Sequence, residues 1–276
     1  MCIYRIGEMA DMLGVSSETL RFYERKGLIR PVERNKESRY RHYSTWELHM
    51  LLCARIYSSM GIQLDQLAQI FHDPEYCVHD ILASIQQQEQ KLEQQLLYTR
   101  LCQRRMQDTQ NFLKDVERSK HARFCEKRMR EGIYILQNQS NSKLDTDADV
   151  RLEFARWTQF PVFLFSSGRI GLRALQMNEP EFFFGIGMEE TYADALSIAA
   201  SGHVRYFPPQ MCLYTVIETS NEDPLSFQRI QRLLAEQQIH IQDVAGDITT
   251  STIFMTQKNS VYHCFHSIYI PIHEHR

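Results

Sequence analysis

The chain has 276 residues, of which 43% are hydrophobic and 24% are charged, and its formal net charge is −3. This length accommodates two domains, and the composition is typical of a folded globular protein. No run of about 18 apolar residues is present, so no membrane-spanning helix and no membrane partner are expected. The first residues, MCIYRIGEMAD, lack the apolar core of a signal peptide. Seven cysteines without a C-x-x-C pair predict reduced thiols and a cytoplasmic protein.

Basic residues are concentrated near the N-terminus. Residues 1–60 hold ten Lys or Arg against seven Asp or Glu, a net charge of +3. Residues 61–120 have a net charge of −2, and residues 121–276 have −4. Only the first segment has the sign expected of a surface that faces phosphates, and its excess is small. Charge alone is therefore weak support for nucleic-acid binding.

Residues 1–75 are predicted to form short helices joined by brief breaks. Apolar residues recur at helical spacing up to Gly14, which ends the first helix. Ser16 is placed to cap a second helix that extends to Gly27. After a polar stretch and the alternating segment RYRHY, Ser44 is placed to cap a third helix, with Glu47 as its capping-box partner.

The first two helices fit a helix-turn-helix, with Gly14 as the turn residue that tolerates a positive φ. Leu20 and Phe22 of the second helix are expected in the core. Four side chains of this helix are expected to face outward: Ser17, Thr19, Arg21 and Tyr23. Hydroxyl groups bind phosphates or base edges, and an arginine can bind guanine with two hydrogen bonds. The pattern by itself also occurs in helical hairpins that do not bind DNA.

The segment TLRFYERKGLIRP, followed by RYRHYS, resembles the winged-helix head of the MerR family. In that family a pattern close to T-L-R-x-Y-E-x-x-G-L-I-x-P precedes Y-R-x-Y. The resemblance covers residues 4–75 and implies that Arg21 and Tyr23 lie at the major groove of double-stranded promoter DNA. It further implies that four residues belong to the wing, Arg39 and Arg41 gripping the flanking backbone and Tyr40 and Tyr43 supporting the wing or bonding phosphates.

Residues 78–117 contain no Gly and no Pro and follow a heptad pattern. The a positions are Val78, Ile85, Leu92, Thr99, Met106 and Leu113, and the d positions are Ile81, Gln88, Gln95, Cys102, Thr109 and Val116. The pattern predicts that residues 76–120 form one long dimerisation helix in a coiled coil with a partner chain. An antiparallel arrangement of two such helices in a homodimer would hold two heads apart on a pseudo-palindromic site. Half of the d positions are polar, so a long helix that lies on its own domain is the alternative.

Residues 121–276 are predicted to form an α+β domain. Strand-like runs cover 132–136, 162–165, 182–186, 211–218, 248–254 and 261–270, and helical segments cover 149–157 and 225–237. The order of FCEKRMREGIYIL, FFFGIG, PPQMCLYTVIE and YIPI resembles GyrI-like effector-binding domains. That resemblance implies two strand–helix–strand–strand halves around a central ligand pocket. The expected fold is therefore multi-domain: an all-α winged helix-turn-helix head, a long coiled-coil helix and an α+β GyrI-like effector domain.

In multidrug-sensing MerR regulators, such a domain binds bulky lipophilic cations through aromatic faces and one buried carboxylate. The position that matches this acid is Asp247, in AGDITT, while Glu189, Glu190 and Glu218 are rival acids. Six aromatic residues are candidates for the pocket wall: Trp157, Phe183, Tyr192, Tyr214, Phe254 and Tyr262. The family resemblance further implies an activator that distorts promoter DNA in response to this effector and so acts on RNA polymerase indirectly.

Two other functions are open alternatives. Some MerR regulators sense metals through thiolates, but Cys77, Cys102 and Cys125 are too far apart in the chain to form a compact ligand set. Some GyrI-like domains hydrolyse small molecules, yet no G-x-S-x-G, H-E-x-x-H or phosphate loop is present. The chain is therefore expected to be no enzyme, with no catalytic residues, no cofactor and no metal site.

Overall fold

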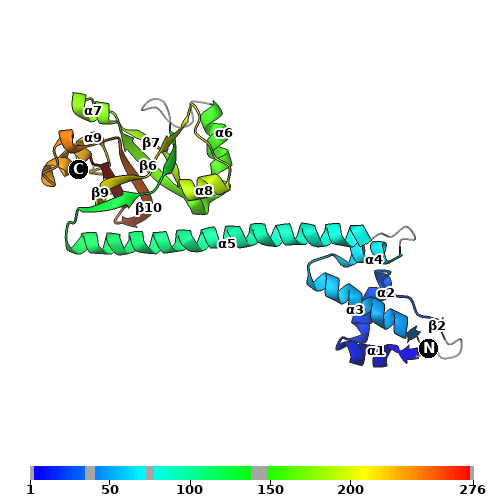
Figure 1. Cartoon of the computed structure of the whole chain (residues 1–276). Coiled ribbons are helices and arrows are strands. Elements are labelled where there is room, and N and C mark those ends of the chain that lie inside the picture. Colours follow the sequence, from blue (N-terminus) through cyan, green and yellow to red (C-terminus); the bar gives the residue numbers. More distant parts are fainter. Residues whose placement is uncertain (1–2, 35–40, 73–77, 138–147, 274–276) are drawn as a thin grey trace. The chain divides into compact units, whose positions relative to one another are not determined.

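The computed structural model describes residues 3–34, 41–72, 78–137 and 148–273 (Figure 1). The chain divides into two compact units, Met1–Tyr98 and Thr99–Arg276. The division falls inside the long helix α5 (Val78–His121), not at either end of it. The reason is that α5 supplies Ile81 to the hydrophobic core of the first unit and Phe112 and Val116 to a core of the second.

The first unit consists of helices and a small sheet. Before α5, its helices are α1 (Ile6–Leu13), α2 (Ser17–Arg25), α3 (Thr45–Ser59) and α4 (Leu64–His72). Three short antiparallel strands lie in the order β1 (Ile3–Arg5), β3 (Arg41–Ser44) and β2 (Glu33–Arg34). Its fully buried core contains Met9, Leu20, Leu28, Leu51 and Leu67.

Local sequence explains where these helices begin and end. Gly14 has φ of 64°, so the residue that ends α1 is in the left-handed region that favours glycine. The Ser16 hydroxyl accepts a 3.1 Å hydrogen bond from the Thr19 amide and caps α2. Ser44 caps α3, and its amide donates to Glu47 Oε2 at 2.8 Å, which confirms the predicted capping box.

The helix α5 spans the predicted heptads. Its d positions and its a and e positions have different surroundings. The d residues Ile81 and Val116 are buried in the chain's own cores, and Cys102 packs against another. The large apolar residues at the a and e positions that are exposed are Val78, Leu82, Leu92, Leu96, Met106 and Leu113. The exposed apolar seam of α5 therefore follows a and e, while three of the d residues pack within the chain's own cores.

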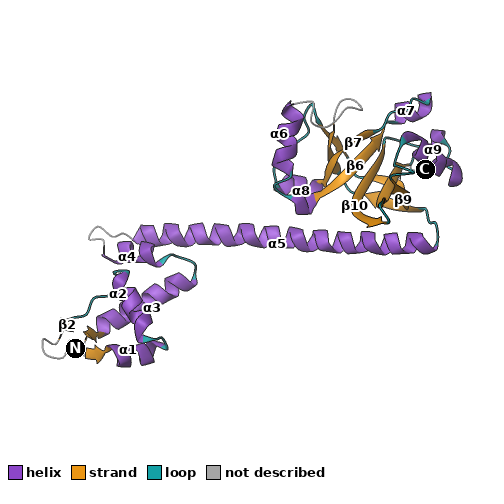
Figure 2. Cartoon of the chain, turned by 180° about the vertical axis from the view of Figure 1, so that it is seen from behind, coloured by secondary structure: helices purple, strands orange, loops and turns teal. Residues whose placement is uncertain are grey.

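An eight-stranded antiparallel sheet forms the centre of the second unit (Figure 2). The strand order is β4-β9-β11-β10-β6-β7-β5-β8. The bounds, in that order, are Glu126–Arg130, Gln210–Ser220, Val261–Pro271, Ile248–Lys258, Leu164–Ile170, Phe183–Glu189, Ile133–Gln137 and Val204–Phe207.

This sheet contains two strand–helix–strand–strand halves. In the first half, β5 leads through α6 (Ala148–Trp157) to β6 and β7. In the second, β9 leads through α9 (Phe227–Glu236) to β10 and β11. The halves meet where β10 pairs with β6, as in the arrangement that the sequence resemblance implies. Figure 2 shows α6 and α8 (Glu190–Ala195) beside one half of the sheet, with α7 (Leu172–Met177) and α9 beside the other half.

The sequence analysis missed several short elements of this unit. The strands β4 and β8 extend the two edges of the sheet, and α7 and α8 each have only six residues. Two single 3-10 turns, Pro161–Phe163 and Ile241–Asp243, precede β6 and β10. Four of the five residues of β4 are charged, so it lacks the apolar enrichment by which the other strands were predicted.

Candidate nucleic-acid interface and ligand cavity

The helix α2 has one face in the core and one face in solvent. Leu20 is fully buried, as predicted, and Tyr23 packs half-buried against the same core. Ser17 and Thr19 are half-buried, while Arg21 is exposed. Of the four α2 residues predicted to face a nucleic acid, Arg21 is therefore the one whose side chain reaches farthest into solvent.

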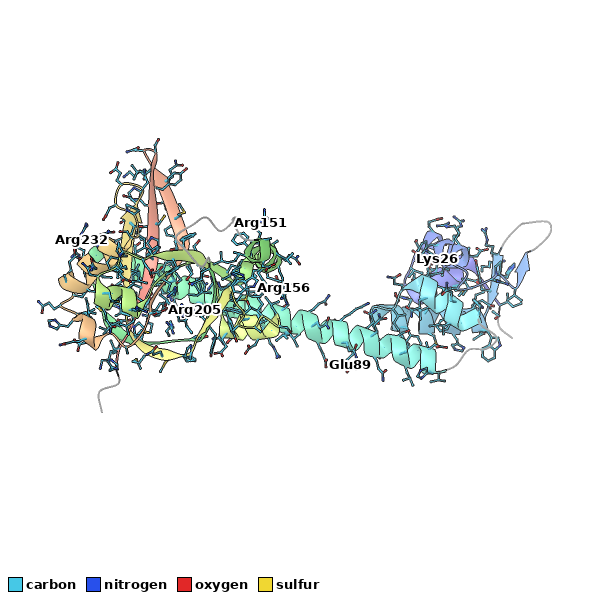
Figure 3. The ribbon with its side chains drawn as sticks, turned by 90° about the horizontal axis from the view of Figure 1, so that it is seen from above. Lys26, Glu89, Arg151, Arg156, Arg205 and Arg232 are labelled. Carbon is cyan, nitrogen blue, oxygen red and sulfur yellow. The ribbon has the colours of Figure 1, made fainter. Side chains whose placement is uncertain are left out.

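The prediction that Phe22 lies in the core is wrong, since this side chain is 38% exposed. Two residues along a helix correspond to a rotation of about 200°, so a buried Leu20 turns Phe22 outward. The Lys26 ammonium lies 5.8 Å from the centre of the Phe22 ring. Lys26, labelled in Figure 3, also donates to Asp65 Oδ2 at 2.8 Å, which ties the end of α2 to α4.

Glu18 forms ion pairs with both arginines of α2, Arg21 and Arg25. Glu18 accepts from Arg25 Nη1 at 3.1 Å and from Arg21 Nη1 at 3.2 Å. These two hydrogen bonds, the one from Arg25 being the larger cause, lower the pKa of the Glu18 carboxyl below its ordinary value. All three side chains are exposed, so a phosphate can replace Glu18 as the partner of either guanidinium.

The wing begins with β2 and returns through β3, and an ion pair joins β3 to α2. Arg41 Nε lies 3.1 Å from Glu24 Oε2. Tyr43 is fully buried, and its burial together with the charge of Glu24 raises the pKa of its hydroxyl to about 12. Of the two roles expected for Tyr43, burial favours support of the wing. Arg39 and Tyr40 lie outside the described residues.

A cavity of about 240 Å³ lies within the second unit, between α5 and the strands that meet at the centre of the sheet. Its walls include four residues of α5: Arg105, Asp108, Asn111 and Phe112. The sheet and its connections supply Arg128, Met129, Arg130, Glu131, Ile133, Phe165, Glu189, Thr249, Thr250, Ser251 and Tyr269. The cavity is therefore polar and charged on several sides, with apolar side chains between the charges.

One wall of the cavity carries the acid Glu189, which the sequence analysis had named as a rival to Asp247. Burial raises the pKa of this carboxyl to about 7, although Arg105 opposes the shift. Arg105 Nη1 lies 3.5 Å from Glu189 Oε1. The Arg105 guanidinium also donates to the carbonyl oxygens of Val162 at 3.1 Å and Leu164 at 2.9 Å. These hydrogen bonds connect α5 to the residues at the start of β6.

A second wall is built around Arg128. Its guanidinium donates to Asp115 Oδ2 at 2.8 Å and to Glu126 Oε1 at 2.6 Å. Its Cζ lies 3.7 Å from the centre of the Tyr214 ring, and the Tyr214 hydroxyl donates to the same Asp115 oxygen at 2.9 Å. Burial is the largest cause that raises the pKa of this hydroxyl above its ordinary value. Arg128 is thus compensated by two carboxylates and an aromatic face.

A third arginine, Arg130, is only 4% exposed. Its Nη1 donates to Thr249 Oγ1 at 3.1 Å and its Nη2 to the Pro208 carbonyl at 2.9 Å. Both partners are uncharged, unlike the carboxylates that face Arg105 and Arg128.

The helices α1 and α2 and the paired strands β2 and β3 form a winged arrangement in which Arg21 is exposed. Residues 4–73 match the MerR HTH family of regulatory proteins. We call this segment the MerR-type head. The mercuric resistance operon regulatory protein of Bacillus cereus is 39% identical over 67 residues, which are 24% of this chain and 50% of that protein. The transcriptional activator TipA of Streptomyces coelicolor is 35% identical over 71 residues, 26% of this chain and 28% of TipA. The chain thus spans half or less of the length of these relatives.

Among solved structures, an EcmrR–DNA complex matches 99% of this chain and 100% of its own, with a TM-score of 0.36 and 12% identity. The N-terminal part of MtaN, a multidrug transporter activator of Bacillus subtilis, matches 43% of this chain and 99% of its own, with a TM-score of 0.29 and 22% identity.

Asp247, the predicted counter-ion of a cationic ligand, does not line the cavity. Its Oδ2 accepts from Arg169 Nη1 at 2.7 Å, and its Oδ1 accepts from the Leu172 amide at 2.9 Å, at the start of α7. Arg169 stacks on the ring of Phe183, with Cζ 4.1 Å from the ring centre. The carboxylate thus has a buried cation and the start of a helix as its partners in this structure.

None of the six aromatic candidates for the pocket wall lines this cavity either. Trp157 and Tyr192 are fully buried in one core, where Tyr192 stacks on Phe163 at 4.7 Å between ring centres. The Tyr192 hydroxyl donates to the wall residue Asp108 at 3.1 Å, and the ring of Tyr214 contacts the wall residue Arg128. Phe254 stacks on Phe265, and Tyr262 is 48% exposed on the β10–β11 hairpin.

Two signals in the sequence point to the cavity. Glu126, Arg128 and Arg130 alternate in EKRMR, which predicts that they share one face of a strand. Arg105 and Asp108 lie one turn apart on the long helix, next to the apolar seam. Neither signal identifies the partner elements, because those come from β6, β7 and β10, far along the chain.

Over the described ranges, no group of three or more His, Cys, Asp or Glu side chains is placed to hold a metal ion. Cys102 and Cys125 are partly buried and free, and Cys77 lies outside the described residues. Within the same part of the chain, no helix has the length and apolar character needed to cross a membrane.

Proposed function

We propose that this protein is a ligand-responsive transcription regulator of the MerR type, which binds double-stranded promoter DNA as a homodimer. The observation that carries the proposal is the MerR-type head, in which α2 exposes Arg21 next to a wing that is tied to α2 through Arg41 and Glu24. In this proposal Arg21, Ser17, Thr19 and Tyr23 face the major groove. The wing, with Arg41 and the neighbouring Arg39 and Tyr40, holds the flanking phosphates.

The homodimer is proposed to form through α5. Leu92 and Leu96 are 60% and 51% exposed and lie one turn apart on the seam of a and e positions. Such a row of large apolar side chains is costly to leave in water, and a second copy of the same helix in antiparallel orientation covers it. Two MerR-type heads held apart in this way match two half-sites of one operator.

The second unit is proposed to be a GyrI-like effector domain whose ligand site is the cavity on α5. Its two strand–helix–strand–strand halves support this assignment. The wall of the cavity includes Arg105, Asp108 and Phe112 of α5. The same helix contributes Ile81 to the core of the first unit. A ligand that favours one position of α5 therefore shifts the population of dimers that distort the promoter, and RNA polymerase responds to the DNA.

The ligand is proposed to be a small organic molecule with an aromatic or apolar part. The expectation of a cation depended on Asp247, which is engaged by Arg169. Neither alternative function has a specific observation in its favour. The described residues offer no metal-ligating group, and the family to which the head is similar consists of regulators rather than enzymes.

In vitro selection from a random duplex library tests the DNA-binding part of this proposal. The full chain is expected to enrich a pseudo-palindromic site, because two identical MerR-type heads read two half-sites. The matched variant Arg21→Ala is expected to enrich it weakly or not at all. Recovery of unselected sequences by the unaltered protein would falsify sequence-specific binding.

A further inference from the structure

The buried guanidinium of Arg130 is the starting point. It lies at the end of β4, opposite Gln210 of β9, and its side chain forms part of the cavity wall. Its two hydrogen bonds go to neutral oxygens, of Thr249 and Pro208. Within the described residues its Nε is buried without a hydrogen-bond partner. A buried cation of this kind is stable only when a partner compensates its charge.

The other charged groups of the wall are compensated. Arg105 pairs with Glu189, and Arg128 pairs with Asp115 and Glu126. Glu131, which also belongs to the wall, accepts from Arg104, whose Nη2 lies 2.5 Å from both carboxylate oxygens. Asp108, the remaining charged wall residue, lies 3.9 Å from Arg104 Nε and accepts from the Tyr192 hydroxyl.

No carboxylate among residues 3–34, 41–72, 78–137 and 148–273 lies within ion-pair distance of Arg130. The charge of Asp247 acts on Arg130 from farther away, but that carboxylate is bonded to Arg169. Burial lowers the pKa of Arg130. An arginine nevertheless keeps its proton in proteins, so the positive charge persists in the wall.

The surroundings of Arg130 fit an anion with an organic body. Thr249 Oγ1 accepts from Arg130, which directs its own proton away from the guanidinium and leaves the hydroxyl able to donate. Beyond these donors, Ile133, Phe165 and Phe112 supply apolar surface to the same cavity. The combination of a fixed cation, a hydroxyl donor and an apolar wall suits one charged end and one ring system.

We propose that the effector of this cavity is an aromatic organic anion, a carboxylate or sulfonate, whose charged group pairs with Arg130 and whose rings lie against Ile133 and Phe165. This inference rests on the proposed function, because it names the class of ligand for the same site. It differs from the expectation of a lipophilic cation in the sign of the ligand charge.

Two fluorescent probes with the same ring skeleton test the inference on the full chain. 8-Anilinonaphthalene-1-sulfonate carries the anionic group, and N-phenyl-1-naphthylamine is its neutral counterpart. The unaltered protein is expected to bind the sulfonate with one site per chain and about tenfold or more tighter than the amine, since a hydrogen bond to a charged group contributes that much. The variant Arg130→Met is expected to lose this preference while it still binds the neutral amine.

The variant Arg205→Met is the matched control. Arg205, labelled in Figure 3, lies on β8 and outside the wall, and its side chain is 52% exposed. The Arg205→Met substitution removes one positive charge from the same unit, as Arg130→Met does. An unchanged preference for the sulfonate in Arg205→Met therefore excludes a general effect of net charge. Thermal melting of each variant checks that the fold is intact. Should Arg130→Met fail to fold, Thr249→Val, which removes only the hydroxyl, is expected to reduce the preference severalfold.

Three results would overturn the inference: equal affinity of the unaltered protein for the two probes, an unchanged preference in a folded Arg130→Met, or no binding of either probe. Binding of the cation tetraphenylphosphonium more tightly than the sulfonate, measured by displacement of the sulfonate, would also contradict the inference. All of these results are independent of the DNA selection experiment. A protein that selects a DNA site but shows no preference for the anion refutes the inference and leaves the DNA-binding function standing.

Discussion

The two units of this protein assemble their candidate sites in opposite ways. In the MerR-type head, the exposed side chains of α2 lie within one continuous helix, and the wing follows within 20 residues of it. In the second unit, the cavity takes its walls from α5 and from strands as distant in the chain as β4 and β10. A site made of one helix can be predicted from a local motif, whereas a site made at the centre of a sheet depends on strand order.

The largest expected effect concerns α5, the element that both units share. The double substitution Leu92→Asp and Leu96→Asp is expected to convert the proposed dimer into a monomer, because it places charges in the exposed apolar seam. Sedimentation velocity measures the outcome. Leu97→Asp is the matched control, since Leu97 is 52% exposed but faces away from the seam. A dimer that survives the double substitution but not the control would place the interface on another face of the helix.

The next prediction concerns Asp247, which similarity suggested as a ligand contact and the structure places beside Arg169. Asp247→Asn is expected to lower the free energy of unfolding by about 2–3 kcal/mol, because Arg169 is left buried without its carboxylate. Urea unfolding measures this loss, and probe titration is expected to show an unchanged affinity in the cavity. A lost affinity with unchanged stability would restore Asp247 as the ligand contact.

The raised pKa of Glu189, in the second unit, predicts that the free energy of unfolding depends on pH. Its pKa is about 7 in the folded protein and 4.5 as its ordinary value, so the native state binds the proton more tightly. The free energy of unfolding is therefore expected to fall as the pH rises from about 4.5 to about 7. Glu189→Gln keeps the side chain neutral and should remove this fall, a difference of up to about 3 kcal/mol. Urea unfolding at pH 5 and pH 8 gives the comparison, and equal slopes in both proteins would contradict it.

In the MerR-type head, Arg21→Ala is expected to reduce affinity for the selected site about tenfold to a hundredfold and to relax the choice of base. The physical reason is the loss of a guanidinium that can bind a base edge with two hydrogen bonds. Fluorescence anisotropy with the selected duplex and with its single-base variants measures both effects. If all duplexes lose affinity equally, Arg21 contacts the backbone instead of a base.

The smallest effect is expected for Arg41→Ala. Loss of one phosphate contact should weaken binding to every duplex by a similar factor, and the slope of log affinity against log salt should fall by about one. Titrations at several salt concentrations measure the slope. The ion pair with Glu24 reduces the charge available to DNA, so Glu24→Gln is expected to change affinity in the opposite direction.

Much of the fold was predictable from local sequence. The helix boundaries at Gly14, Ser16 and Ser44 follow from capping chemistry, and the six predicted strands of the second unit are all present. The errors have local causes too. Phe22 is apolar yet faces solvent, and β4 is rich in charge yet forms an edge strand. In both cases the residue type alone gave the wrong signal, since neighbouring elements decide which face is covered.

The sequence by itself determined the MerR-type head, the long helix and the alternation of strands and helices, because capping, heptads and side-chain alternation act over a few residues. Only the tertiary structure decided which charges meet. It bonded Asp247 to Arg169, paired Glu189 with Arg105, and left Arg130 with neutral partners. The tertiary fold brings these side chains together across 78 to 119 residues of chain, and no local pattern carries that information.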